Sequence, residues 1–361
     1  MAFTCLRYLS FDALKQGCDA QRPLSDEYPF VLYAAVHWGH HARRNEENTL
    51  DMVQEFLSRK QNVAYATTIL LAEKLHDYGR KRTDFGEIHL LSFFGLGRAM
   101  SQLLHINHSA DSKDSSGQTP LSHSATQGHS KVVQLLLTRD DVDVNSKDKY
   151  SRSPLSHAAQ NGRLKVMKLL LARDDIEVNS KDWYSHSPLS YAAENEHLEV
   201  MKLLLAQDDI DVNSKDGNSP LLYAAKKGHV EVTKLLLARD DIEVDSKDSY
   251  DHSPLAYATQ YGHLEVTKLL LARDDIEVNS KDKDGSSPLL HAAKNEHLEV
   301  TKLLLARDNI EVNSKDKYSC SPLSYAAQNG NLEVTKLLLA RDDIEVNSKD
   351  RYSHSPLAYA T

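Results

Sequence analysis

The chain has 361 residues, of which 26% are charged and 40% are hydrophobic, and its formal net charge at pH 7 is −9. This acidic balance excludes a general electrostatic affinity for nucleic acid, because such binding depends on an excess of Lys and Arg. No apolar run approaches the roughly 18 residues that a membrane span requires, and the first residues lack the apolar core of a signal peptide. With only three scattered cysteines, the chain is predicted to be soluble and cytoplasmic, with the nucleus as the other location that these features allow.

Residues 1–84 do not repeat elsewhere in the chain, and apolar residues recur at helical spacing in three stretches of this segment. The stretches cover residues 28–42, 50–57 and 64–75. We therefore expect a small helical region that leads into the rest of the chain.

Three histidines in the first stretch have the spacing of metal ligands on a helix. His37, His40 and His41 lie at i, i+3 and i+4, which would place the imidazoles on one face. No acidic or cysteine ligand is near them in the sequence. We therefore favour a helix that packs Trp38 inward and leaves the histidines partly exposed, and we predict no metal site.

Beyond this segment the chain consists of near-identical blocks, each marked by a proline that follows Ser or Thr and precedes Leu. The marker prolines are Pro120, Pro154, Pro188, Pro220, Pro254, Pro288, Pro322 and Pro356. They are 34 residues apart, except for one step of 32 residues between Pro188 and Pro220. A block of about this length cannot bury its own apolar face, so the copies must stack on one another as a solenoid.

The block that starts at Ser153 illustrates the expected local structure. Ser153 suits a helix N-cap, and Pro154 suits the first helical position. Gly162 is placed to end this helix in a left-handed conformation, and the stretch from Leu164 predicts a second, more apolar helix. Turn-forming Asp, Asn and Ser follow. The predicted fold class is therefore all-α, built from helix–turn–helix–loop units with a 34-residue period.

These blocks resemble the ankyrin repeat, whose signature is T-P-L-H-x-A-A-x-x-G-H. Thr119-Pro120-Leu121 and Gly128-His129 are the closest copies of its two halves. The resemblance implies an ankyrin array over residues 85–361, after a helical linker region at 1–84. We divide the array into a degenerate capping repeat at about 85–113, seven full repeats at about 114–349 and a truncated repeat at 350–361.

The blocks depart from this signature at three places. The His after Leu is replaced in every block, for example by Ser156, which leaves open the loop-bracing hydrogen bond that this histidine makes in the family. The inter-helix Gly is replaced by Glu196 and Glu296, which would carry about 1–2 kcal/mol of strain each in a left-handed conformation. The block between Asp216 and Pro220 lacks two loop residues, which predicts a shorter loop tip.

The C-terminal end of the array is predicted to be uncovered. The chain stops at Thr361, five residues after Pro356, which is too short for another helix pair. The last full repeat, which ends near Asn347, is therefore expected to fray or to associate end to end with another molecule. A simpler explanation is that the chain is a fragment of a longer protein.

The blocks can be aligned with one another, and they differ mainly at the loop tip before each proline and at the two residues before the inter-helix turn. In the ankyrin family these places line the concave groove that receives partners, and Tyr, Trp and Arg often anchor interfaces. The candidate partner-binding residues at the loop tips are Lys149, Tyr150, Arg152, Trp183, Tyr184, His186, Tyr250, His252, Lys283, Lys317 and Tyr318. Those before the turn are Gln160, Asn161, Glu194, Gln260, Tyr261, Lys294 and Gln328.

Two other interpretations of these positions stay open. The differences are also what drift at exposed positions of a recently duplicated array would produce. The Tyr residues recur so regularly that they could pack tip against tip as a structural element. The histidines that recur at one equivalent position are interpreted as structural, and they are His129, His197, His229, His263 and His297.

The N-terminal segment carries a second resemblance. CLRYLSF at residues 5–11 and YPFVLYAAVHWGHHAR at 28–43 are similar to the stretch that joins the nucleotidase module to the ankyrin array in fungal NACHT–ankyrin receptors of the STAND class. This implies that the chain is the sensor half of such a receptor. The sequence contains no GxxxxGK[ST] phosphate loop, so ATP binding is not carried over.

The sequence contains no nucleophile elbow, no metal motif and no unique polar constellation outside the repeated blocks. We therefore predict no catalytic residues and no cofactor. The predicted function is a non-catalytic protein–protein interaction module that binds a polypeptide through the concave groove and loop tips. The alternative is the sensor or autoinhibitory half of a NACHT-type ATPase receptor, in innate recognition or heterokaryon incompatibility.

Overall fold

Helices and the loops between them make up the described part of the chain. The computed structural model describes residues 1–10, 30–75, 85–105, 109–213 and 219–359, and it contains no β-strand in these ranges. The residues form two compact units, Met1–Trp183 and Tyr184–Thr361. The all-α fold expected from the repeated blocks is confirmed. None of the described helices combines the length and the apolar character that crossing a membrane requires.

The first unit begins with four helices that precede the repeats. They are α1 (Ala2–Leu9), α2 (Val31–Arg44), α3 (Glu46–Ser58) and α4 (Lys60–Leu75). Trp38 on α2 is fully buried, and its ring lies 5.1 Å from that of Phe56 and 4.9 Å from that of Phe94. The predicted helical region and the inward packing of Trp38 are therefore confirmed. The neighbouring His37, His40 and His41 are half-buried.

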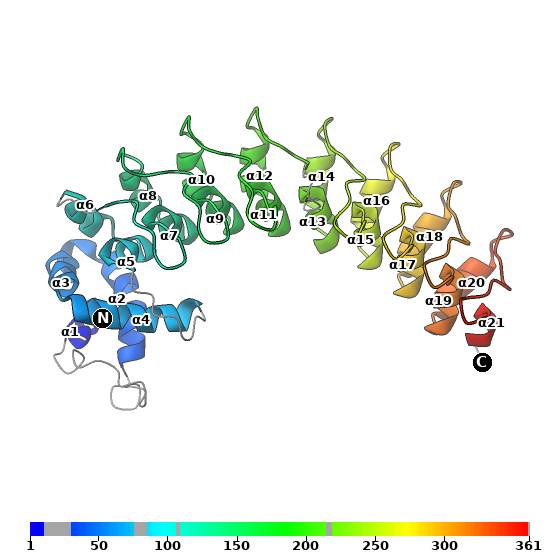
Figure 1. The fold of residues 1–361 in the computed structure, drawn as a ribbon, viewed down its shortest axis with the longest axis horizontal. Helices are drawn as coiled ribbons and strands as arrows, with labels where there is room; N and C mark the ends of the chain where they lie inside the picture. The colour runs from blue at the N-terminus through cyan, green and yellow to red at the C-terminus, as the bar shows by residue number, and fades with distance from the viewer. Residues whose placement is uncertain (11–29, 76–84, 106–108, 214–218, 360–361) are drawn as a thin grey trace. The chain divides into compact units, whose positions relative to one another are not determined.

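The helix pairs of the first unit stack side by side. The pairs are α5 (Glu87–Phe94) with α6 (Gly97–His105), α7 (Pro120–Gln127) with α8 (Ser130–Leu136), and α9 (Pro154–Gln160) with α10 (Leu164–Leu170). Helices α5, α7 and α9 form one row and α6, α8 and α10 a second row (Figure 1). Helices α2 and α3 pack against α5 and α6, so the N-terminal helices cover the outer side of the first pair.

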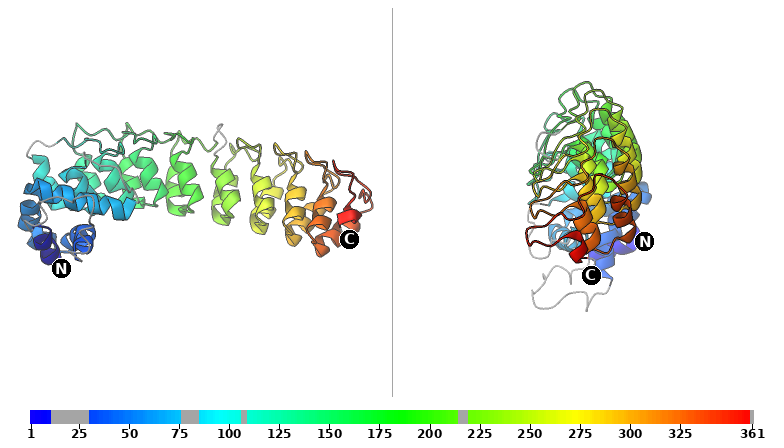
Figure 2. Two further views of the ribbon diagram at one scale, coloured as in Figure 1. Left: turned by 60° about the horizontal axis from the view of Figure 1, so that its bottom comes forward. Right: turned by 90° about the vertical axis from the view of Figure 1, so that its right-hand side faces the viewer.

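The second unit repeats the same arrangement. Its pairs are α11 (Pro188–Glu194) with α12 (Leu198–Leu205), α13 (Pro220–Lys227) with α14 (Val230–Leu237), α15 (Pro254–Gln260) with α16 (Leu264–Leu271), α17 (Pro288–Lys294) with α18 (Leu298–Leu305), and α19 (Pro322–Gln328) with α20 (Leu332–Leu339). A last short helix, α21 (Pro356–Tyr359), packs against α19. Within each unit, the loops that connect successive pairs lie along one side of the helices (Figure 2).

The first helix of each full proline-marked repeat begins with a side-chain cap. The hydroxyl of Ser153 accepts a hydrogen bond from the backbone N–H of Ser156 at 3.2 Å, and Pro154 occupies the first turn, where its missing N–H costs nothing. The caps that accept in this way are Thr119, Ser153, Ser187, Ser219, Ser253, Ser287 and Ser321. Leu155 and Leu170 are fully buried, which confirms that both helices of this block face the core.

The turn between the paired helices requires a left-handed residue. Gly162 and Gly228 have φ angles of 64° and 76°, and Glu196 and Glu296 have φ angles of 56° and 59°. A Cβ at Gly228 would lie 2.5 Å from Nδ1 of His263 in the next repeat, so glycine here meets both a backbone and a packing requirement. The two glutamates are thus left-handed, which is the condition under which the sequence analysis assigned them strain.

Glu296→Gly is expected to stabilise the second unit. The substitution removes about 1–2 kcal/mol of left-handed strain and adds about 0.5–1 kcal/mol of backbone entropy cost, so the net gain is about 0.5–1 kcal/mol. Urea unfolding followed by circular dichroism measures it. The matched control is Asn295→Gly, because Asn295 has a φ of −100° and no such strain to relieve, and this variant should be destabilised. A loss of stability in Glu296→Gly would contradict the prediction.

The recurring histidines tie each repeat to the turn of the one before it. Nε2 of His129 lies 3.0 Å from the carbonyl oxygen of Phe93, and Nε2 of His229 lies 2.9 Å from that of Glu194. His263 and His297 make the equivalent hydrogen bonds, to Lys226 and Gln260. Their predicted structural role is therefore confirmed at these four positions.

Two expectations about the array remain to be considered, namely the shorter loop tip and the uncovered C-terminal end. The shorter loop tip predicted between Asp216 and Pro220 lies outside the described residues. Leu332 and Leu339 on α20 are exposed, whereas their counterparts on α18, Leu298 and Leu305, are half-buried. End-to-end association through this region stays a prediction.

Candidate partner-binding surface

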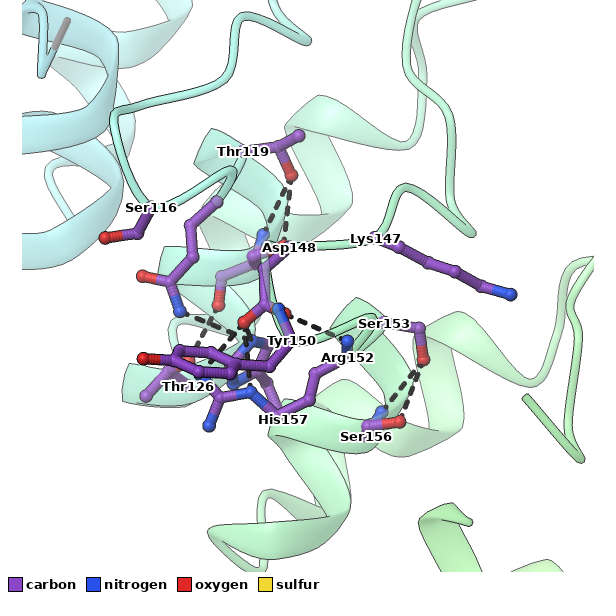
Figure 3. A network of polar contacts seen from close by, with 12 residues as sticks. Ser116, Thr119, Thr126, Lys147, Asp148, Tyr150, Arg152, Ser153, Ser156 and His157 are labelled. Carbon is purple, nitrogen blue, oxygen red and sulfur yellow. Dashed lines mark hydrogen bonds and ion pairs between the residues drawn. The ribbon is translucent and has the colours of Figure 1, made fainter. Parts of the chain in front are cut away.

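In the described part of the chain, loop tips are built around an aspartate, which is half-buried at Asp248 and buried at the others. In the tip before α9, Oδ1 of Asp148 accepts hydrogen bonds from the backbone N–H groups of Tyr150 at 2.8 Å and Arg152 at 2.9 Å. Its Oδ2 lies 3.2 Å from Nε2 of His157 on α9 and 2.9 Å from Nη2 of Arg152 (Figure 3). One carboxylate therefore fixes the tip backbone and joins it to the helix that follows.

The charge of this carboxylate is maintained by its partners. Burial by itself raises the pKa of Asp148, but the hydrogen bond from His157, the Arg152 backbone N–H and the Arg152 charge outweigh it and hold the pKa at about 2. Burial also lowers the pKa of His157, so its ring is neutral at pH 7 and donates one N–H to Asp148. The tip is thus held by a carboxylate that stays ionised at neutral pH.

The loop-bracing hydrogen bond that the sequence left open is present, but from a different position. The signature position directly after Leu121 holds Ser122, and the bracing side chain is the next one, His123, 3.0 Å from Asp114. The other bracing pairs are His291 with Asp282, Tyr257 with Asp248, Tyr325 with Asp316 and Tyr359 with Asp350. Sequence reasoning missed these pairs because His and Tyr alternate at this position, although both donate to a carboxylate.

Successive loop tips are also joined through their backbones. The N–H of Trp183 donates to the carbonyl of Tyr150 in the first unit at 3.0 Å. In the second unit the N–H of Lys283 donates to Tyr250 at 3.0 Å, and the N–H of Lys317 donates to Asp284 at 2.7 Å. Asp284 occupies the position that is Tyr in most tips and makes the same backbone contacts. The tip backbone therefore does not require an aromatic side chain.

The aromatic candidates at the tips are largely exposed. Their exposed fractions are 47% for Tyr150, 70% for Trp183, 64% for Tyr184, 65% for Tyr250 and 39% for Tyr318. The backbone of each of these tips turns through a left-handed residue, such as Ser151 with a φ of 62°. The rings are therefore presented outward by loops whose conformation is fixed from beneath.

The first unit brings two of these rings together. The centroids of Tyr150 and Trp183 are 6.1 Å apart at an interplanar angle of 74°, an edge-to-face arrangement. The guanidinium of Arg152 lies over the Tyr150 ring at 5.2 Å. Lys149, next to Tyr150, is exposed. The result is an exposed aromatic pair flanked by positive charge.

The candidate histidines of the tips in the second unit contribute to its internal packing. The ring of His186 is stacked on Tyr191 at 5.0 Å and on Tyr223 at 5.2 Å, and its Nε2 lies 2.5 Å from the Tyr223 hydroxyl. His252 is stacked on Tyr257 at 5.0 Å. Both rings are half-buried. These two candidates connect tips to helices and present little surface to a partner.

The candidates before the inter-helix turn divide in the same way. Tyr261, Lys294 and Gln328 are exposed, and Nζ of Lys294 lies 4.7 Å over the ring of Tyr325 in the next repeat. The other four are half-buried, namely Gln160, Asn161, Glu194 and Gln260. The structure therefore places the exposed candidates of this set on the second unit.

A ladder of asparagines links the loop arms that follow the second helices. Nδ2 of Asn145 donates to the carbonyl of Asp175 at 2.7 Å, and its Oδ1 accepts the N–H of Glu177 at 2.9 Å. Asn213, Asn279 and Asn313 repeat this pair of bonds in the second unit. Asp245 stands at the same position, where its Oδ2 accepts the N–H of Glu277. Sequence reasoning recorded these positions as nearly constant and did not detect the ladder.

Helix pairs capped by Ser/Thr-Pro and joined by aspartate-centred loop tips define an α-helical repeat protein. The sequence model of the family described as ankyrin repeats (3 copies) matches residues 88–182, 189–282 and 274–350, which is more than half of the chain. The chain belongs to the ankyrin-repeat family. A comparison with curated proteins finds no match. The matched residues begin at 88, so they do not include the segment that resembles NACHT–ankyrin receptors.

Proposed function

We propose that this chain is a non-catalytic module that binds a polypeptide partner through its loop tips and the exposed residues before the inter-helix turns. The observation that carries the proposal is that the positions at which the repeats differ hold exposed aromatic rings, including those of Trp183 and Tyr250. Ankyrin repeats mediate protein–protein contacts in general, and repeat stacks offer extended surfaces for such contacts.

The loop tips have the rigidity that a binding surface needs. Their backbones are fixed by buried carboxylates and by hydrogen bonds between neighbouring tips. A loop that is already ordered loses less entropy on binding, so more of its contact energy contributes to affinity. Because Asp284 keeps the same backbone contacts without a ring, conformational stability of the tip does not explain why Tyr recurs. The ring is therefore not needed to hold the tip backbone, which supports recognition as its role, and Tyr150 and Trp183 also contact each other across neighbouring tips.

The Tyr150–Trp183 pair is the strongest candidate anchor in the first unit. Tyr and Trp supply large contact areas at low cost in side-chain entropy, and the exposed Lys149 adds positive charge beside them, whereas the charge of Arg152 is paired with Asp148. An acidic segment that carries an apolar residue fits this surface best. We therefore expect the partner to present both features.

The double substitution Tyr150→Ala with Trp183→Ala is expected to reduce binding of the partner by at least about 30-fold, because truncation of one aromatic hot-spot residue costs about 2 kcal/mol, which corresponds to about 30-fold in affinity. The measurement is quantitative affinity capture with the full chain, followed by titration of the captured protein. The matching change in the second unit is Tyr250→Ala with Tyr318→Ala, which tests whether its tips contribute.

The control replaces exposed residues away from the tips. Lys165→Ala with Lys168→Ala changes the solvent-facing side of α10 and should leave binding within about twofold. Circular dichroism would verify that all variants remain folded. Unchanged affinity in both aromatic variants would refute the proposed surface and favour drift at exposed positions.

The sensor half of a NACHT-type receptor is a second candidate, and it rests on the resemblance of residues 5–11 and 28–43. The packing of Trp38 against Phe94 supports it, because this contact couples the N-terminal helices rigidly to the first repeat. A partner bound to the array could thereby influence a module attached to those helices. Addition of the chain to a NACHT ATPase of such a receptor should lower its turnover, and no change would count against this role.

A further inference from the structure

The second unit contains a cluster of three metal-ligating side chains from two neighbouring repeats. His252 lies in the loop tip before α15, Asp282 lies in the tip before α17, and His291 lies on α17. One nitrogen or oxygen atom from each lies within 4.8 Å of the others. Nε2 of His291 is 2.9 Å and Nε2 of His252 is 3.4 Å from Oδ2 of Asp282.

A hydrogen bond to Asp282 explains the position of the His291 ring, but no hydrogen bond explains the position of the His252 ring. The His291–Asp282 distance is that of an ordinary hydrogen bond, whereas both ring nitrogens of His252 lie beyond the usual range of about 2.7–3.2 Å from a carboxylate oxygen. Its Nε2 is 3.4 Å from Asp282, and its Nδ1 is 3.5 Å from Asp248. The Nδ1 atom is buried and has no hydrogen-bond partner. The ring nevertheless has a fixed position, because it stacks on Tyr257 at 5.0 Å.

We propose that His252, Asp282 and His291 form a zinc site that crosslinks the two repeats. Zinc binds imidazole nitrogen and carboxylate oxygen at about 2.0–2.2 Å, so two ligand atoms of a tetrahedral ion lie about 3.3 Å apart. The distances of 2.9 and 3.4 Å bracket this value. Two histidines and one carboxylate are a common three-ligand set for zinc, which leaves a fourth position for water.

The surroundings of Asp282 prepare it to act as a ligand. Its Oδ1 accepts the N–H groups of Asp284 at 2.9 Å and Ser286 at 2.8 Å, which leaves Oδ2 for the histidines. Asp248, beside Nδ1 of His252, is placed as the outer carboxylate that orients a ligating imidazole.

The other repeats supply natural comparisons. In the first unit His157 also pairs with an aspartate, but the side chain beside it from the preceding tip is Gln118, at 3.3 Å. Elsewhere in the second unit the bracing residue is Tyr, as at Tyr257 and Tyr325. Within the described ranges, the cluster of three occurs once. A combination that occurs once in near-identical repeats is not required by the repeat fold.

His291→Tyr is the most informative test, because Tyr is native at this position in other repeats and hydrogen-bonds to the aspartate there. We expect isothermal titration of the full chain with zinc chloride to give one specific site, and His291→Tyr to weaken binding about 100-fold or more. Zinc should raise the melting temperature of the wild type and not that of the variant. His252→Ser is a second variant that should lose the site and keep the Asp282–His291 hydrogen bond.

The matched control is His354→Ser. His354 has the same place in its loop tip as His252, and the bracing residue of its own repeat is Tyr359. This variant should bind zinc as the wild type does. Wild-type titration curves in both His291→Tyr and His252→Ser would overturn the proposal, as would the absence of any zinc-dependent change in the melting temperature of the wild type.

Discussion

Asp148→Ala is expected to destabilise the first unit by about 3–5 kcal/mol. The substitution leaves His157 and the guanidinium of Arg152 without the carboxylate that they share, and it removes the acceptor of two backbone N–H groups in the tip. Removal of one partner from a buried ion pair typically has a cost of this size. Denaturant unfolding monitored by the fluorescence of Trp38 and Trp183 would measure it.

The free energy of unfolding measured below pH 4 provides an independent test of the role of Asp148. The folded-state pKa of Asp148, about 2, is lower than the usual 3.8, so its contribution is fully present above about pH 4 and is lost as the pH falls through 2. In Asp148→Ala this part of the pH dependence should be smaller by about 2 kcal/mol. The control is Asp140→Ala at an exposed position, which should behave as the wild type. Equal stability of Asp148→Ala and the wild type would refute the assigned role.

Asp245→Asn is expected to stabilise the second unit. Asp245 stands in the asparagine ladder, but a carboxylate cannot donate, and its Oδ1 is buried without a hydrogen-bond partner. Burial and the negative charges of Glu277 and Asp275 raise the pKa of Asp245, the hydrogen bond from the Glu277 N–H lowers it, and the net pKa is about 6. A shift from 3.8 to about 6 corresponds to about 3 kcal/mol, and partial solvent exposure reduces the expected gain to about 1–2 kcal/mol at pH 7.5.

The pH dependence of the stability gain shows whether it comes from the charge of Asp245. Because the folded pKa of Asp245 is raised, its charge opposes folding above pH 6, and the penalty declines as the pH falls from 6 to 4. The advantage of Asp245→Asn should therefore narrow across that interval. The reverse substitution, Asn279→Asp, should destabilise the unit at pH 7.5 and recover over the same range. A constant difference at all pH values would contradict the assignment.

Several features of the fold followed from the sequence because they depend on local chemistry. Ser153 and Pro154 predicted a helix start, and Gly162 predicted its end, since caps and left-handed turns are properties of a few adjacent residues. Trp38 was expected inside because an apolar ring of that size is rarely left in water. The repeat length then required stacking, which the family match supports.

The candidate site was only partly predictable. The sequence identified Trp183 and Tyr250 as exposed aromatic residues at the tips, and both are exposed. It grouped them with Arg152, which pairs with Asp148, and with His252, whose ring stacks on Tyr257. Variation between blocks shows only that a position tolerates different residues. Whether the side chain at that position points to solvent or inward depends on the charged and aromatic groups of the neighbouring loops and helices, which the sequence of one block does not show.

The order of residues along one block determined the helices, their ends and the need for copies to stack, since each of these is decided within a few turns of chain. The partners of Asp148, Asp245 and Asp282 lie 2–32 residues away in sequence, and the distant ones were decided only when neighbouring loops packed beside one another. A buried carboxylate responds to every donor and charge within a few ångströms, and those neighbours are set by tertiary packing. Aspartate therefore has three different roles in near-identical repeats: Asp148 fixes a loop tip, Asp245 destabilises the asparagine ladder, and Asp282 is the proposed metal ligand.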